Sequence, residues 1–182
     1  MNGLFAGMPM YDATHVECAE YQPAFQWFGG KATVARAVWG AIGDVSSYVE
    51  PFFGSGAVLH TRPAAHLAKN RKETINDLDG FVANFWRATK ADRAGVAAHC
   101  DWPCNELDLT ARHAWLMGQA AAHKERMLAD PEYYDAKIAG WWCWGQTWWI
   151  GGGWCDGTGG WERRFENECG GLCARGQVNG YR

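Results

Sequence analysis

The sequence lacks a surplus of basic residues: 17 Lys and Arg stand against 20 Asp and Glu, which gives a net charge of −3. No global positive field therefore favours nucleic acid, although a local basic patch on such a protein still supplies phosphate contacts. The composition of a disordered chain is also missing, because 48% of the residues are hydrophobic and 20% are charged. A chain of 182 residues with this composition predicts one globular domain with its own core.

No Lys or Arg precedes Lys31, so the basic start of a secretory signal peptide is missing. Together with an odd number of cysteines, seven, this predicts a cytoplasmic protein with reduced thiols. The pairs Cys100–Cys104 and Cys169–Cys173 leave a zinc site open as an alternative. Their spacing is a weaker zinc signal than Cys-x2-Cys, and we expect no metal.

The chain also lacks a convincing membrane span. Six of its 12 tryptophans fall within residues 138–155, which carry no charge and are barely long enough to cross a bilayer. Tryptophan belongs at the membrane interface rather than mid-span, and Gly151–Gly153 would loosen any helix. We interpret these tryptophans as packing residues. The alternative is stacking on DNA bases, with phosphate contacts from Lys69, Arg71, Lys72, Arg163, Arg164 and Arg175.

Hydrophobic patterns and turn residues indicate an α/β order in the first half of the chain. After a loose leader over residues 1–24 we expect, in order, a helix over 31–42, a strand over 46–52, a short helix over 57–62, a strand ending at Asn76–Asp77 and a helix over 78–100. This order is the beginning of a doubly wound, Rossmann-like α/β sheet, and we assign it to residues 25–100.

Residues 101–182 have a different character, with helical segments followed by Trp- and Gly-rich sequence. A long helix over 101–128 is predicted to be capped by Asn105, with Asp108 three residues on. The Asp-Pro-Glu sequence at 130–132 predicts the start of another helix. We interpret this part of the chain as an insertion or recognition region.

The most informative stretch is the turn after the first predicted strand, Glu50-Pro51-Phe52-Phe53-Gly54-Ser55-Gly56. Glycines in such a turn let backbone N–H groups approach a ligand, but only two of the three glycines of a dinucleotide site are present. Asp77 lies 27 residues after Glu50 and ends the next strand, where an acidic side chain accepts both hydroxyls of a ribose. A strand-end cap is the alternative role for Asp77.

The segment Trp27-Phe28-Gly29-Gly30-Lys31, upstream of the sheet, narrows the ligand class. S-adenosylmethionine (SAM) needs walls around a sulfonium and its charged methionine tail. Lys31 offers a cation to a carboxylate, and Trp27 offers an aromatic face to a cationic group. SAM is therefore favoured over a nicotinamide cofactor, which stays open as an alternative. A core role for Trp27 and a solvated helix start for Lys31 are the corresponding structural alternatives.

These blocks resemble the Dam-like (D12 class) DNA adenine N6-methyltransferases in order and approximate spacing. The resembling segments are Trp27–Lys31, Tyr48–Val58 and Ile75–Asp79. The resemblance implies SAM as cofactor, double-stranded DNA as partner, and methyl transfer to N6 of an adenine flipped out of the duplex, in a bacterial or phage-infected cell. It implies cofactor contacts at Trp27, Lys31, Glu50, Phe53, Gly54, Ser55, Gly56 and Asp77.

The same resemblance implies a catalytic Asp/Asn-Pro-Pro-Tyr/Phe loop after a later strand, and the 182 residues contain no such sequence. Asp101–Cys104 lacks the second proline and ends in cysteine, and Asp130–Tyr133 has glutamate in that place after a charged, helix-forming segment. We therefore name no catalytic residue. We expect an incomplete methyltransferase that needs a C-terminal half or a partner chain; a non-catalytic SAM- or DNA-binding module acting with a partner is the alternative.

Overall fold

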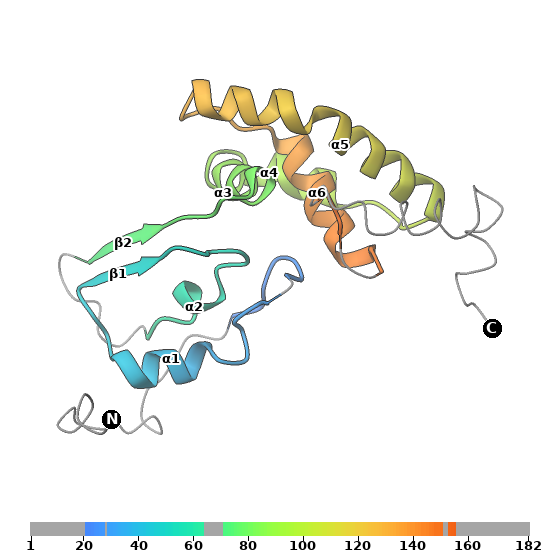
Figure 1. The fold of residues 1–182 in the computed structure, drawn as a ribbon. Coiled ribbons are helices and arrows are strands. Elements are labelled where there is room, and N and C mark those ends of the chain that lie inside the picture. The colour runs from blue at the N-terminus through green and yellow to red at the C-terminus, as the bar shows by residue number, and fades with distance from the viewer. Residues whose placement is uncertain (1–20, 28, 64–70, 151–152, 156–182) are drawn as a thin grey trace, which may run out of the picture. The chain divides into compact units, whose positions relative to one another are not determined.

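The computed structural model describes residues 21–27, 29–63, 71–150 and 153–155 (Figure 1). Within these ranges the structure is mixed α/β and mostly helical, with one two-stranded parallel sheet. This confirms the predicted α/β class. The chain divides into two compact units, unit 1 over Met1–Leu78 and unit 2 over Asp79–Arg182.

Unit 1 is built around strands β1 (Ser47–Glu50) and β2 (Lys72–Ile75), which pair in parallel. Helices α1 (Ala35–Ile42) and α2 (Ala57–His60) lie on the same side of the sheet (Figure 1). Their core comprises Ala35, Trp39, Tyr48 and Val58. The other face is open: Val49 on β1 is 63% exposed, and all four residues of β2 are exposed.

The elements of unit 1 follow the predicted order but are shorter than predicted. The helix expected from Lys31 begins at Ala35, because Gly30 and Val34 donate their N–H groups to Trp27 and Lys31 in turns. The first strand ends at Glu50 rather than 52, since Pro51 has no N–H to donate to a ladder.

Unit 2 contains helices α3 (Gly80–Ala91), α4 (Arg93–Cys100), α5 (Glu106–Ala129) and α6 (Ala136–Trp148). The single helix expected over 78–100 is therefore wrong. It is divided at Asp92, whose φ of −142° is not helical and whose side chain accepts a hydrogen bond from Gly95 N at 2.9 Å. The predicted cap of α5 is confirmed, because Asn105 Oδ1 accepts from Asp108 N at 2.8 Å.

The predicted helix start at Asp130 is also wrong. Asp130 ends α5, and its carboxylate accepts from Glu132 N at 2.9 Å in a turn. Helix α6 begins at Ala136, capped by Asp135, whose carboxylate accepts from Ile138 N at 2.9 Å. The Asp-Pro-Glu sequence therefore marks a turn between two helices.

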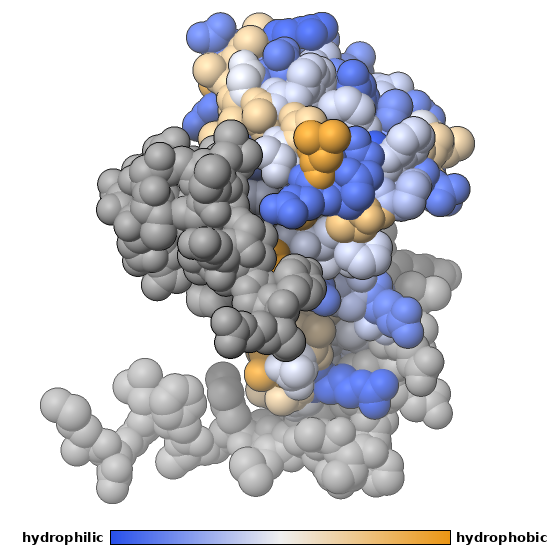
Figure 2. Space-filling model, turned by 90° about the vertical axis from the view of Figure 1, so that its right-hand side faces the viewer, coloured by the Kyte–Doolittle hydropathy of each residue, from blue (hydrophilic) through white to orange (hydrophobic). Residues whose placement is uncertain are grey.

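Helix α6 is the centre of unit 2 and packs against α3, α4 and α5. Trp142 and Trp144 on α6 and Trp154 beyond it are buried, which fits the predicted packing role. Trp148 is 46% exposed and does not belong to this core. On the face shown in Figure 2, the described residues are mostly hydrophilic, with hydrophobic ones scattered among them. Among the helices described, none is long and apolar enough to cross a bilayer.

Candidate functional site

The glycine turn of unit 1 lies where the two parallel strands end. Glu50 and Ile75 are paired in the sheet, so the residues that follow both strands meet at one edge. Phe53 N donates to Asn76 O at 2.9 Å, which ties the turn to the end of β2. Gly54 and Gly56 have φ of 52° and 71°, a left-handed region in which glycine carries no steric penalty.

Asp77 is held directly against this turn. Its Oδ2 accepts a hydrogen bond from Gly54 N at 2.8 Å, and the residue is half-buried. The structure therefore brings together the turn and the acid that the sequence predicted as partners.

Trp27 packs on the same turn. A Cβ added at Gly54 would lie 2.7 Å from Trp27 Cδ1 and 2.8 Å from its Nε1, so the indole occupies the space that any side chain at 54 would need. The Phe25 ring contacts Trp27 edge-on, with the centroids 5.9 Å apart. Because Trp27 is only half-buried, the ring forms a wall beside the turn.

Lys31 and Glu50 form an ion pair at the start of the turn, with 3.3 Å between Nζ and Oε1. Lys31 Nζ also donates to Phe52 O at 2.6 Å. Glu50 is 4% exposed, and its Oε2 accepts from Tyr48 OH at 2.9 Å. Burial, and then the carboxylate beside it, raises the pKa of Tyr48.

Glu50 Oε1 lies at ion-pair distance from Lys31 but accepts no hydrogen bond from the residues that the structure describes. A buried carboxylate oxygen without a hydrogen bond is costly and unusual in a folded protein. Within this pair Glu50 is buried, whereas Lys31, with its side chain 37% exposed, remains open to solvent.

The remaining predicted residues, Phe53, Ser55 and Gly56, form the buried floor of the turn. A Cβ at Gly56 would lie 2.8 Å from both Phe53 Cζ and His60 Cδ2, so only glycine fits there. Tyr21 OH donates to Ser55 O at 2.5 Å and stacks on His60, with the ring centroids 4.7 Å apart.

Sequence reasoning missed Tyr21 and His60. Tyr21 fell within the predicted leader, which has no hydrophobic period, and His60 occupies an ordinary helix position. Burial lowers the pKa of His60, against the raising influence of Glu50 and Glu73. The sequence signal for Tyr21 is the aromatic content of residues 21–28 just before the Gly-Gly pair.

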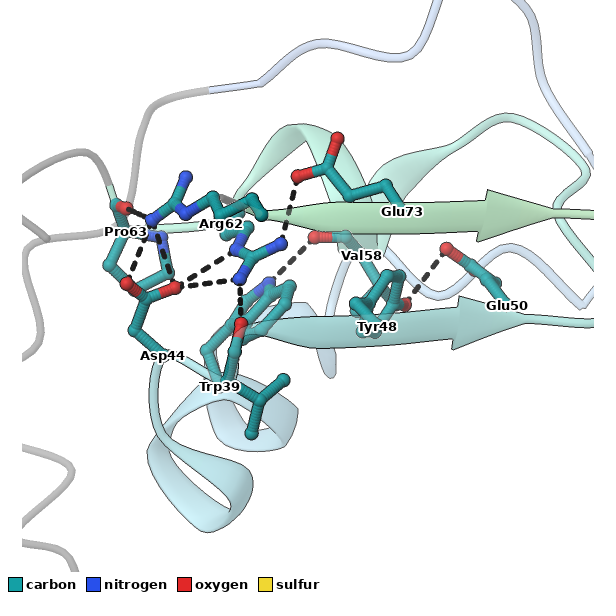
Figure 3. A network of polar contacts seen from close by, with 10 residues as sticks. Trp39, Asp44, Tyr48, Glu50, Val58, Arg62, Pro63 and Glu73 are labelled. Atoms are coloured by element: carbon teal, nitrogen blue, oxygen red, sulfur yellow. Dashed lines mark hydrogen bonds and ion pairs between the residues drawn. The ribbon is translucent and has the colours of Figure 1, made fainter. Parts of the chain in front are cut away.

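A charged network supports the sheet at the end opposite the turn (Figure 3). Arg62, with 4% of its side chain exposed, pairs with Asp44 at 2.9 Å and with Glu73 at 2.8 Å, and its guanidinium lies 5.2 Å from the Trp39 ring centre. Arg71 pairs with Asp44 at 2.8 Å. Since Arg71 is bound within this network, it is a poor candidate for the phosphate contact considered above.

The eight predicted cofactor residues all lie in unit 1, around one turn; their contact with a cofactor stays a prediction. The two near-matches to a catalytic loop lie elsewhere: Asp101 ends α4 and Asp130 ends α5, so neither follows a strand. No group of three metal-binding side chains occurs in the described parts of the chain. Lys69, Arg163, Arg164, Arg175, Cys169 and Cys173 lie outside the described residues.

Comparison with protein families gives a match over much of the chain. A family model described as D12 class N6 adenine-specific DNA methyltransferase matches residues 27–136, more than half of the chain. The matched range contains all eight predicted cofactor residues and reaches the first residue of α6. Neither the comparison with curated proteins nor the comparison with solved structures gave a match.

Proposed function

Because the chain belongs to the D12 class of N6 adenine-specific DNA methyltransferases, we propose that unit 1 binds SAM as part of a methyltransferase fold that modifies adenine in double-stranded DNA. The site of action is the cytoplasm of a bacterial or phage-infected cell. The observation that carries the proposal is the joint position of Asp77, the Gly54 turn and Trp27 at one end of two parallel strands.

The adenosine end of SAM is assigned to the turn and Asp77. Parallel strands with a glycine turn hold nucleotides at their carboxyl ends, and a carboxylate after the second strand accepts hydrogen bonds from the ribose hydroxyls. The 2.8 Å bond from Gly54 N fixes the Asp77 carboxylate beside the turn. Side chains pack so closely against Gly54 and Gly56 that both positions require glycine, which fixes the conformation of the turn.

The methionine end of SAM is assigned to Lys31, Glu50 and Trp27. An amino acid zwitterion carries one ammonium and one carboxylate, which complements the Lys31–Glu50 pair charge for charge. The half-open Lys31 suits the carboxylate, while the buried Glu50, whose Oε1 lacks a hydrogen bond among the described residues, supplies a negative charge that attracts the ammonium. The Trp27 ring offers its face to the sulfonium.

SAM supplies an electrophilic methyl group, and this chain supplies its binding and orientation. The step that remains is alignment of the adenine amine with that methyl group, which is an orientation effect. No Asp-Pro-Pro-Tyr sequence occurs in the 182 residues to provide it. We infer that methyl transfer requires residues that this sequence does not contain.

The test is calorimetric titration of SAM into wild-type protein and the Asp77→Asn variant. Asparagine keeps an oxygen for Gly54 N but replaces the other carboxylate oxygen with a donor. Hydrogen bonds to charged groups are worth about 1.5–3 kcal/mol, so we expect SAM to bind at least about tenfold more weakly. Asp92→Asn, in the cap of α4 in unit 2, is the matched control and leaves SAM affinity unchanged.

Two results would count against the proposal. One is equal SAM affinity in wild type and Asp77→Asn. The other is tighter binding of NAD than of SAM in a parallel titration, which favours the oxidoreductase alternative. A non-catalytic module acting with a partner is the second candidate function, favoured by the missing loop. It predicts SAM binding without methylation of duplex DNA, whatever chain is added.

A further inference from the structure

Unit 2 contains an aromatic cavity that the function proposed above does not use. Its volume is about 500 Å³, within the usual range of about 300–1,000 Å³ for ligand sites. Its walls come from α4, from the α4–α5 connection, from α5 and from α6. The principal lining residues are His99, Trp102, Asp108, Arg112, Trp115 and Trp141.

The walls of this cavity are held in place by direct contacts. Trp115 and Trp141 meet edge to face, with their ring centroids 5.1 Å apart. Trp102 Nε1 donates to Asp108 Oδ2 at 2.8 Å, and Trp144 Nε1 donates to Trp102 O at 2.8 Å. The aromatic surface is thus presented by tied rings rather than by mobile ones, which lowers the entropy cost of binding.

Trp102 distinguishes the cavity from ordinary core packing. The residue is 52% exposed, whereas Trp142 and Trp144 on α6 are 1% and 3% exposed. A large apolar surface left in water while its N–H is tied back to Asp108 is more typical of a binding surface than of a core.

The charges around the cavity indicate which class of ligand it can bind. Arg112 is 8% exposed, and its guanidinium lies 5.2 Å from the Trp102 ring centre and 4.9 Å from that of Trp141. Lys137 Nζ lies 4.5 Å from the centre of Trp115 and 4.3 Å from that of Trp141. Two cations on these rings disfavour a cationic guest, which an aromatic cage would otherwise suit.

Arg112 also lacks a complete set of partners. Its Nη1 is buried and has no hydrogen-bond acceptor among the residues described. Burial lowers the pKa of this guanidinium, against the raising effect of Asp108. A planar guest that carries hydrogen-bond acceptors, such as a nucleobase, matches both the unsatisfied Nη1 and the aromatic walls, because indole rings stack on bases.

We propose that this cavity binds one unstacked base of a DNA strand, with Lys137 directed to a neighbouring phosphate. The inference rests on the proposed function in one respect, namely that DNA is the substrate. Stacking on rings accepts every base, so the cavity is expected to hold pyrimidines as well as purines. This tolerance separates it from an adenine-specific target pocket.

The test uses fluorescence anisotropy with the full chain and labelled duplexes carrying one central bulged thymine. The comparison duplex is identical except that the bulged nucleotide is abasic. Loss of a base–aromatic stack typically weakens binding about tenfold, so we expect the bulged thymine to bind about tenfold more tightly than its abasic counterpart. A bulged adenine is expected to show a similar preference.

Variants of the protein test whether the preference for the bulged duplex depends on the cavity. Trp102→Ala is expected to abolish it, and Trp102→Phe, which keeps a ring, to retain most of it. Trp148→Ala is the matched control, since Trp148 is 46% exposed on α6 and does not line the cavity. Lys137→Gln is expected to weaken both duplexes equally and to reduce the slope of log affinity against log salt by about one.

The outcomes separate this inference from the proposed function. Equal binding of the bulged and abasic duplexes by wild-type protein overturns the inference, and so does a preference that survives Trp102→Ala. Neither result bears on SAM affinity, which the Asp77 titration measures independently. Conversely, if the protein fails to bind SAM but still prefers the bulged duplex, only the function proposed for unit 1 is contradicted.

Discussion

Gly54 is the residue on which the proposed cofactor site most directly depends. Its φ of 52° is strained for any other residue, and an added Cβ would lie 2.7 Å from the Trp27 indole. We expect Gly54→Ala to destabilise the protein by about 2 kcal/mol and to weaken SAM binding, because the ring or the turn must shift. Urea unfolding followed by circular dichroism, together with the SAM titration, measures both effects.

Gly118 provides the matched control for this substitution. It lies within α5, and an added Cβ meets nothing within 4 Å. Gly118→Ala is expected to stabilise the protein by about 0.5–1 kcal/mol and to leave SAM affinity unchanged. If the two glycine variants behaved alike, the close approach of Trp27 would have no energetic importance.

At the other end of the sheet, the Asp44 carboxylate is expected to make the free energy of unfolding depend on pH. Burial alone would raise the pKa of its carboxyl, but hydrogen bonds and charge from Arg71 and Arg62 outweigh burial and lower it. A pKa that is lower in the folded state stabilises the protein above the unfolded-state value of about 3.9. This stabilisation is lost as the pH falls through the folded-state pKa.

We therefore expect Asp44→Asn to cost about 2 kcal/mol at pH 7, since it leaves two arginines with a weakened partner. The difference from wild type is expected to stay level down to about pH 5 and to shrink below about pH 4. Urea midpoints across this pH range give the measurement. Glu125→Gln, at an exposed position on α5, is the control; a difference that grew towards acid pH would contradict the assignment.

At the scale of elements, Asn84 joins α3 to the turn before α6. Its side chain is fully buried, donating to Asp135 O at 2.9 Å and accepting from Asp135 N at 2.8 Å. Asn84→Ala leaves both backbone groups without this partner, and each such buried group costs about 1–3 kcal/mol. We expect a loss of about 3 kcal/mol, measured by urea unfolding.

Asn105→Ala is the comparison, because it is the same substitution in the same unit at an exposed position. Asn105 caps α5, and the loss of such a cap costs about 1 kcal/mol. The expected ranking therefore places Asn84→Ala well above Asn105→Ala. The reverse ranking would mean that the buried clamp contributes little to the packing of α6.

The elements show how far sequence patterns reach. The order of helices and strands, the Asn105 cap and the glycine turn were predictable because they depend on residues within about one helical turn of each other. The division at Asp92 was not predictable, because the apolar pattern continues on both sides of this single residue. The predicted helix start at residues 130–132 was wrong, because these residues end α5 in a turn and Asp135 caps the next helix.

The candidate sites differ in the same way. The cofactor hypothesis could be formed from the sequence because it depends on short motifs: the glycine turn, Asp77 and the Trp-Phe-Gly-Gly-Lys segment. The ion pair of Lys31 with Glu50 and the stacking of Tyr21 on His60 depend on tertiary contacts that no periodicity encodes. The aromatic cavity of unit 2 likewise needs the α4–α5 connection, α5 and α6 to bring Trp102, Trp115 and Trp141 together.

At the scale of the whole molecule, the compact units and the family match divide the chain differently. The units meet at Leu78–Asp79, whereas the match runs over residues 27–136 and so includes parts of both. The functional boundary predicted near residue 100 came from a change in composition and stays a prediction. Helices α3 and α4 pack with α6, which explains why they fall in unit 2.

The exposed strand β2 also bears on how the protein behaves at high concentration. A strand at the edge of a sheet offers its backbone to any other extended chain, and Ile75, 44% exposed on β2, would add an apolar contact to such a pairing. Strand β2 opens with Lys72 and Glu73, charges that resist stacking of like strands. In the part of the chain that the structure describes, β2 pairs only with β1, so these two ionic side chains are what discourages a second copy from adding to its other edge.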